Sequence, residues 1–129
     1  MKSQDNRPLS PHLQIYRLPF AAILSITHRA TGVILSMAAL SMIWVLAAAA
    51  SGSESYSSIH VHFSTWYGQI FLFGVTLSLY IHLCNGIRHL FWDAGLGFEL
   101  ETAAISAKGA IAAAVILTSA TWLIALNVG

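Results

Sequence analysis

The sequence predicts an all-α membrane protein with three transmembrane helices. Of the 129 residues, 57% are hydrophobic and only 9% are charged, whereas about a quarter of the residues of a soluble domain carry charge. In lipid the backbone must satisfy its own hydrogen bonds, which favours helices. Three stretches lack Asp, Glu, Lys and Arg, and each approaches the roughly 20 residues that cross a bilayer as helix. They are Ala30 to Ala50, Ser64 to Ile87, and Gly109 to Val128.

These stretches define a single membrane domain over residues 1–129. The polar sequence before the first stretch predicts a cytoplasmic N-terminal segment, and a polar, turn-rich loop is expected at Ser51 to Ser58. Trp66 and Trp92 lie near the two ends of the second stretch, where interfacial aromatic anchors are expected. The expected elements are the N-terminal segment at about 1–20 and transmembrane helices at about 21–50, 64–91 and 107–128.

Basic side chains gather on one side of the predicted membrane. They precede or open the first span and flank the second loop, whereas the first loop, near Ser51 to Phe63, has none. The basic residues concerned are Lys2, Arg7, Arg17, Arg29, Arg88 and Lys108. Because cytoplasmic loops carry the excess of Lys and Arg, the N-terminus is predicted to be cytoplasmic and the C-terminus to lie on the outer side. This orientation places Arg29 and His82 in the cytoplasmic half of the membrane.

The N-terminal sequence indicates in which membrane the protein lies, and the single cysteine limits its disulfide and metal chemistry. Met1 to Tyr16 is mostly polar and contains Asp5, so we expect neither a signal peptide nor an Arg- and Ser-rich organelle leader. A bacterial inner membrane is therefore favoured over a mitochondrial one. Cys84 has no partner for an internal disulfide and gives no support for a zinc or iron–sulfur site. The net charge of +1 gives no indication of a nucleic-acid partner.

His82 is the ionisable residue that the apolar pattern explains least. Ionisable side chains within a span are costly, so each one calls for a partner. A neutral imidazole in an apolar helix either hydrogen-bonds to a neighbouring helix or ligates a metal, and both interpretations are open at this point. Gly86 lies one turn further along the same face. It either leaves space for a flat macrocycle such as haem or allows close helix packing.

His89 and Arg88 follow His82 toward the cytoplasmic end of the second span. His89 lies about two turns beyond His82 on nearly the same face, and Arg88 is on the adjoining flank. Their side chains either extend to the interface or bind the propionates of a haem held by His82. A low-spin b haem also needs a second axial ligand. His28 is the candidate within this chain; otherwise the haem bridges two polypeptides.

Ser25 and Arg29 are spaced i, i+4 in the first span, so their side chains share one helix face near the cytoplasmic interface. A guanidinium stays charged and offers several donors, which would stabilise negative charge on a quinone oxygen during reduction. The alternative is that Ser25 bonds to its own helix and Arg29 faces lipid headgroups. Spacing alone favours this alternative.

Two stretches resemble the cytochrome b subunit family of succinate dehydrogenases, the larger membrane anchors of respiratory complex II. The first, Arg7 to Gly32, reads RPLSPHLQIYRLPFAAILSITHRATG and has the family's Arg-Pro opening and Ser-x-x-His-Arg-x-Thr-Gly ending. The second, His82 to Gly95, reads HLCNGIRHLFWDAG and has the family's His-x-x-x-Gly-x-Arg-His segment and following Asp. Together they cover about a third of the chain. The third span carries no diagnostic residue.

The resemblance implies a role for each matching residue. His82 would be the axial haem ligand, and the opposite ligand would be a histidine of the second, smaller anchor subunit. The residues implied for the haem pocket or propionates are His28, Arg88 and His89, and those implied for the quinone site are Ser25 and Arg29.

The same resemblance implies an anchor subunit of a succinate:quinone oxidoreductase. Such a chain holds haem b jointly with the second anchor, forms part of the ubiquinone-reduction site, and docks the flavoprotein and iron–sulfur subunits at the inner face. It takes no part in succinate chemistry itself. Two alternatives are the anchor of a quinol:fumarate reductase and a haem-free helical scaffold or small transporter subunit. In the haem-free case His82 would be a packing or proton-relay residue.

Overall fold

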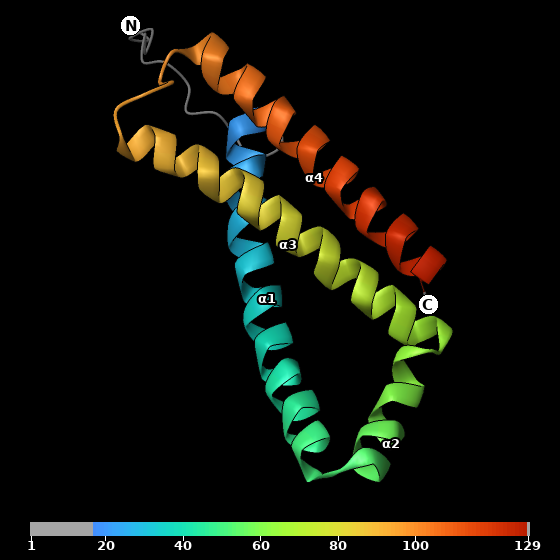
Figure 1. Cartoon of the computed structure of the whole chain (residues 1–129). Helices are drawn as coiled ribbons and strands as arrows, with labels where there is room; N and C mark the ends of the chain where they lie inside the picture. The colour runs from blue at the N-terminus through green and yellow to red at the C-terminus, as the bar shows by residue number, and fades with distance from the viewer. Residues whose placement is uncertain (1–16, 129) are drawn as a thin grey trace, which may run out of the picture.

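The computed structural model describes residues 17–128, and this part of the chain is helical and contains no strand (Figure 1). Three of its four helices are long and apolar enough to cross a membrane. The predicted all-α class with three spanning helices is therefore confirmed. The predicted cytoplasmic segment and the Arg-Pro opening at Arg7 lie largely or wholly outside the described residues. The helices are α1 (Phe20–Ser51), α2 (Ser53–Phe63), α3 (Trp66–Asp93) and α4 (Leu100–Val128).

The long helices extend beyond the apolar stretches that predict them. The 32 residues of α1 would span about 48 Å at 1.5 Å per residue, against a hydrocarbon core of about 30 Å. A helix of this length tilts or continues into the headgroup region. Helix α4 begins at Leu100, ahead of the start expected at about 107. Its first residues, which include Glu101, are helical although they precede the apolar run that starts at Gly109.

The expected polar loop after the first span is wrong for most of its length. Residues Ser53–Phe63 form helix α2, and Gly52 alone, with φ 122°, separates it from α1. Such a positive φ suits glycine, which has no Cβ. The serines that suggested turns instead bond back to the helix, with Ser57 Oγ donating to the carbonyl oxygen of Ser53 at 2.7 Å. Ile59 packs inward and is buried.

Two contacts between long helices, α3 with α4 and α1 with α3, dominate the arrangement. Helices α3 and α4 run side by side in opposite directions, while α1 crosses α3 near the N-terminal end of α1 and the C-terminal half of α3 (Figure 1). Beyond this crossing α1 and α3 diverge, and α2 closes the wide end between them. The two histidines singled out from the sequence lie at the crossing.

The interior of this helix assembly is small and partly polar. Among the described residues the buried apolar side chains are Leu24, Ile59, Ala107 and Ala114, and the buried polar ones are Thr31, Ser78, Asn85, Arg88 and Thr118. Large apolar side chains instead face outward along all three long helices. Small and polar residues at helix contacts with apolar residues outside are typical of proteins that pack in lipid.

Candidate functional site

The crossing of α1 and α3 brings His28 and His82 into face-to-face contact. Their ring centroids are 4.0 Å apart and the ring planes differ by 11°. His28 comes from α1 and His82 from α3, so the stack is an interhelical contact between two imidazoles that the sequence placed only within separate spans. Both rings are half-buried.

The His82 ring is oriented by hydrogen bonds at one nitrogen. Nδ1 of His82 lies 3.1 Å from the backbone carbonyl oxygen of His28 and 3.2 Å from Oγ1 of Thr31. Because a carbonyl oxygen only accepts, its bond with the ring requires a hydrogen on Nδ1. This tautomer leaves the lone pair of the His82 ring on Nε2. The alternative of a hydrogen bond to a neighbouring helix is thus realised without using the nitrogen that a metal would need.

Glycines of the opposite helix lie beside each of the stacked rings, and the closer approach is at Gly32. A Cβ atom built at Gly32 would lie 3.2 Å from Cε1 of His82, and one built at Gly86 would lie 3.8 Å from Cε1 of His28. Each imidazole therefore rests near a glycine of the opposite helix. At Gly86 the ring of His28 lies at an ordinary contact distance, so α1 packs on α3 here, and the predicted space for a macrocycle stays a prediction.

His89 and Trp92 extend the aromatic cluster along α3. The ring centroid of His89 is 5.2 Å from that of His28 and 5.1 Å from that of Trp92. Trp92 also donates from its indole nitrogen to the carbonyl oxygen of Gly97 at 3.1 Å. The expected interfacial anchor is thus packed into the protein on one face. Nδ1 of His28 is buried and has no hydrogen-bond partner among the described residues.

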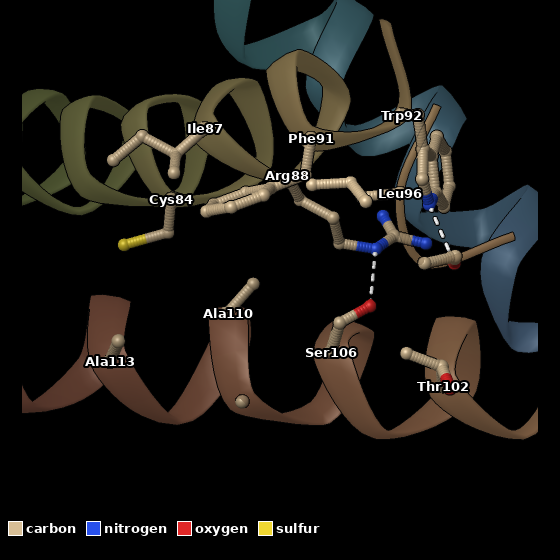
Figure 2. Close-up of a pocket in the computed structure, with 12 residues that line it drawn as sticks. Cys84, Ile87, Arg88, Phe91, Trp92, Leu96, Thr102, Ser106, Ala110 and Ala113 are labelled. Carbon is tan, nitrogen blue, oxygen red and sulfur yellow. Dashed lines mark hydrogen bonds between the residues drawn. The ribbon is translucent and has the colours of Figure 1, made fainter. Parts of the chain in front are cut away.

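The side chain of Arg88 lies in the contact between α3 and α4 (Figure 2). Its guanidinium donates from Nε to Oγ of Ser106 at 3.1 Å and from Nη1 to Oδ1 of Asn85 at 2.7 Å, and it lies 4.1 Å from the ring centroid of Trp92. Only 6% of the residue is exposed. The interpretation in which Arg88 extends to the interface is therefore wrong. Its predicted contact with haem propionates stays a prediction.

The α3–α4 contact around Arg88 contains a groove of about 420 Å³ (Figure 2). Its walls are mostly apolar or small and include Cys84, Phe91 and Ala110. Cys84 is a free thiol. The polar groups of the groove lie at its loop end, where Arg88 meets Ser106.

Ser25 and Arg29 lie on α1 at the same level as the crossing. Ser25 is half-buried and follows Leu24, whose carbonyl oxygen accepts a hydrogen bond from Nδ2 of Asn85 at 3.3 Å. Arg29 follows His28 and its side chain is exposed. Within residues 17–128 Ser25 makes none of the backbone-directed bonds that the alternative interpretation expected of it.

Three polar residues that sequence reasoning passed over hold this region together. They are Thr31, Asn85 and Ser106. Thr31 is 5% exposed and Asn85 is 1% exposed, whereas Ser106 is half-buried. Thr31 lies three residues after His28, and Asn85 three residues after His82, so each shares a helix face with a histidine. Polar residues on the same face as an intramembrane histidine were the available signal.

Comparisons with known proteins agree on one family. Residues 3–121 match the family model described as the succinate dehydrogenase/fumarate reductase transmembrane subunit. The succinate dehydrogenase cytochrome b556 subunit of Paracoccus denitrificans is 43% identical over 122 residues, which cover 95% of this chain and 94% of the relative. The succinate dehydrogenase cytochrome b560 subunit of Reclinomonas americana is 36% identical over 124 residues, which cover 92% of this chain and 86% of the relative. The mitochondrial cytochrome b560 subunit of Sus scrofa is 39% identical over 74% of this chain and 58% of the relative.

Proposed function

The chain belongs to the succinate dehydrogenase/fumarate reductase transmembrane subunit family, and from this premise we propose that it holds haem b and part of the quinone site of a respiratory complex II. The observation that carries the proposal is the hydrogen-bonded His82 at the α1–α3 crossing. The names of the relatives, which include the term cytochrome b, support haem as the cofactor.

His82 has the features expected of a haem ligand. A metal-binding histidine almost always donates its second ring N–H to a carbonyl or carboxylate, which fixes the tautomer and the ring orientation. The bond from Nδ1 of His82 to the carbonyl oxygen of His28 is of this kind. Nε2 of His82 would hold the iron, and His28 and His89 would line the pocket. The bound haem would supply a one-electron centre close to the quinone.

The second axial ligand is assigned to the partner anchor subunit. The rings of His28 and His82 are stacked on each other at 4.0 Å. His28 would therefore line the pocket beside His82 and would not serve as the second ligand. His60 and His62 belong to α2, at the wide end between α1 and α3, away from the crossing (Figure 1). The family resemblance implies a histidine of the second anchor subunit as the other ligand. Among the described residues His89 lies on the same helix as His82, and no histidine besides it and His28 is near the crossing, which supports a haem shared with that chain.

Ser25 and Arg29 are proposed to bind ubiquinone beside this haem pocket. Arg29 is exposed and follows His28 directly, and Ser25 lies one turn earlier on the same face of α1. The guanidinium would stabilise the charge that develops on a quinone oxygen, and the serine hydroxyl would donate to the same head group.

The remaining roles concern the assembly. The chain would lie in a bacterial inner membrane with its N-terminus cytoplasmic, and would dock the flavoprotein and iron–sulfur subunits on that side. Succinate oxidation would take place in those subunits and electrons would reach quinone here. The family model also covers fumarate reductases. The relatives described above are all named succinate dehydrogenase subunits, which favours succinate oxidation as the physiological direction.

A reduced-minus-oxidised spectrum of membranes that contain the assembled complex tests the haem assignment. We expect the b-type band in the parent complex and its loss in His82→Ala. The matched control is His60→Ala, which removes an exposed histidine of α2 and should leave the band unchanged. A parent complex without a b-type band, or a His82→Ala complex that keeps it, would reject the proposal.

A further inference from the structure

Thr31 makes contacts that a purely structural threonine in a helix does not require. Its hydroxyl donates to the carbonyl oxygen of His28 at 2.9 Å, a bond back to its own helix. The same oxygen lies 3.2 Å from Nδ1 of His82 on α3. Thr31 is only 5% exposed, so water has little access to its hydroxyl group. We propose that Thr31 is a positioning residue that, as a second acceptor at Nδ1 of His82, strengthens donation from Nε2 to the iron and lowers the potential of the haem.

The hydrogen count fixes the direction of each bond. A threonine hydroxyl has one hydrogen, and the bond to the carbonyl oxygen of His28 uses it. The oxygen of Thr31 can therefore only accept from the ring of His82. Both neighbours of Nδ1, this hydroxyl oxygen and the His28 carbonyl oxygen, are then acceptors. A ring with its hydrogen on Nε2 would place the Nδ1 lone pair against the His28 carbonyl oxygen, which can only accept, so the site disfavours that tautomer.

The ring also has little freedom to turn away from Thr31. The ring of His28 covers one face of His82 at a centroid distance of 4.0 Å. Gly32 lies so close to Cε1 of His82 that a Cβ there would approach to 3.2 Å. Thr31 therefore acts on a ring whose position is already restricted, and its contribution is to the electron density of the ligand.

The expected sign of the potential shift follows from the two acceptors. An acceptor at Nδ1–H makes the opposite nitrogen a stronger donor to iron, which favours the oxidised state. Removing the Thr31 hydroxyl leaves the His28 carbonyl as the one acceptor, so Nε2 donates less. The ligand remains in place while the haem becomes easier to reduce.

Thr31→Val tests this inference in the assembled complex by redox titration of the b-type band. We expect the band to persist and its midpoint potential to rise, and Thr31→Ser, which keeps a hydroxyl, to restore the parent value. Thr27→Val is the matched control, because the Thr27 hydroxyl makes a similar bond back to α1, to the carbonyl oxygen of Ile23 at 2.9 Å, and makes no hydrogen bond to His82 among the described residues. If Thr31→Val fails to assemble, Thr31→Ala removes the hydroxyl without a branched side chain.

The inference rests on the proposed haem role of His82, and the two can fail separately. A b-type band that does not depend on His82 rejects the haem role. A band that depends on His82 but keeps the parent potential in Thr31→Val and Thr31→Ala rejects the role of Thr31 alone. An equal shift in Thr27→Val would likewise reject it, because the effect would then belong to the helix and not to the ring contact.

Discussion

At the scale of single residues, the arrangement separates two basic side chains that look alike in the sequence. Arg29 is exposed on α1, whereas Arg88 is buried between α3 and α4 and bonds to Asn85 and Ser106. An exposed guanidinium beside the histidine stack is available to a ligand from the membrane. A buried one with protein partners mainly fixes helices. This difference assigns the quinone proposal to Arg29.

Substitution of Arg29 by alanine should therefore reduce quinone reduction selectively. We expect a loss of roughly tenfold or more, which corresponds to about 1.4 kcal/mol of lost transition-state stabilisation. Succinate oxidation with an artificial soluble acceptor should be retained, because it bypasses the membrane site. Both rates are measured on the same membranes. Arg17→Ala, which removes another exposed arginine just before α1, is the control and should retain both activities.

Equal loss of both activities in Arg29→Ala would indicate failed assembly of the complex. Unchanged quinone reduction would contradict a role of Arg29 in the quinone site.

At the scale of helices, one polar network ties all three long helices together. Asn85 on α3 donates to the carbonyl oxygen of Leu24 on α1 and accepts from Arg88, which in turn bonds to Ser106 on α4. Asn85 is 1% exposed, so no solvent replaces a lost bond. A buried charged group that loses its partner is destabilising. The α1–α3 crossing, which positions His82, thus depends on the side-chain amide of Asn85.

Asn85→Ala should destabilise the assembled complex. The cost is about 1–3 kcal/mol for each buried group left without a partner, and we expect a lower midpoint temperature in thermal unfolding of the detergent-solubilised complex. Asn127→Ala is the control. That side chain is exposed and donates only to the carbonyl oxygen of Leu123 within α4, so its loss should leave the midpoint within error. Equal midpoints for the two variants would contradict the tie between helices.

The sequence predicts the elements better than their contacts. The apolar runs suffice for three long helices, because hydrophobic length is a property of consecutive residues. Helix α2 was missed because its serines are typical of turns. The break between α1 and α2 is the single residue Gly52, which local sequence does not distinguish from the start of a longer loop. The bond of Arg88 to Ser106 depends on how α4 packs against α3. The stack of His28 on His82 depends on where α1 crosses α3. That crossing is set by residues distant in sequence, such as Leu24 and Asn85, which no local pattern connects.

At the scale of the whole molecule, the surface is more apolar than the interior. Outward-facing side chains such as Met37, Leu40 and Trp44 on α1 are more than 60% exposed, at 67%, 69% and 61%. Lipid or a partner chain must cover them, because exposed apolar area of this extent is unstable in water. The chain is consistent in this respect with an anchor that assembles with other membrane subunits.

The orientation of the chain in the membrane is testable by cysteine labelling. In a Cys84→Ser background, a cysteine at exposed Ser55 in α2 should react with an impermeant maleimide added to intact spheroplasts. A cysteine at exposed Glu99, between α3 and α4, should react only after the membrane is opened. Full labelling of both sites in denaturing detergent is the control for reactivity. The reverse pattern would place the N-terminus outside.

The single crossing of α1 and α3 has a mechanical consequence. The contacts described above between these helices involve Leu24, His28, Thr31 and Gly32 of α1, and the two helices diverge toward the end of α1 that joins α2 (Figure 1). A rotation about this point acts as a pivot: it swings the far ends, joined by α2, through a wide arc and displaces the pivot itself very little. A change in bilayer thickness, which alters helix tilt, should therefore move the far ends relative to each other far more than it changes the distance between His28 and His82.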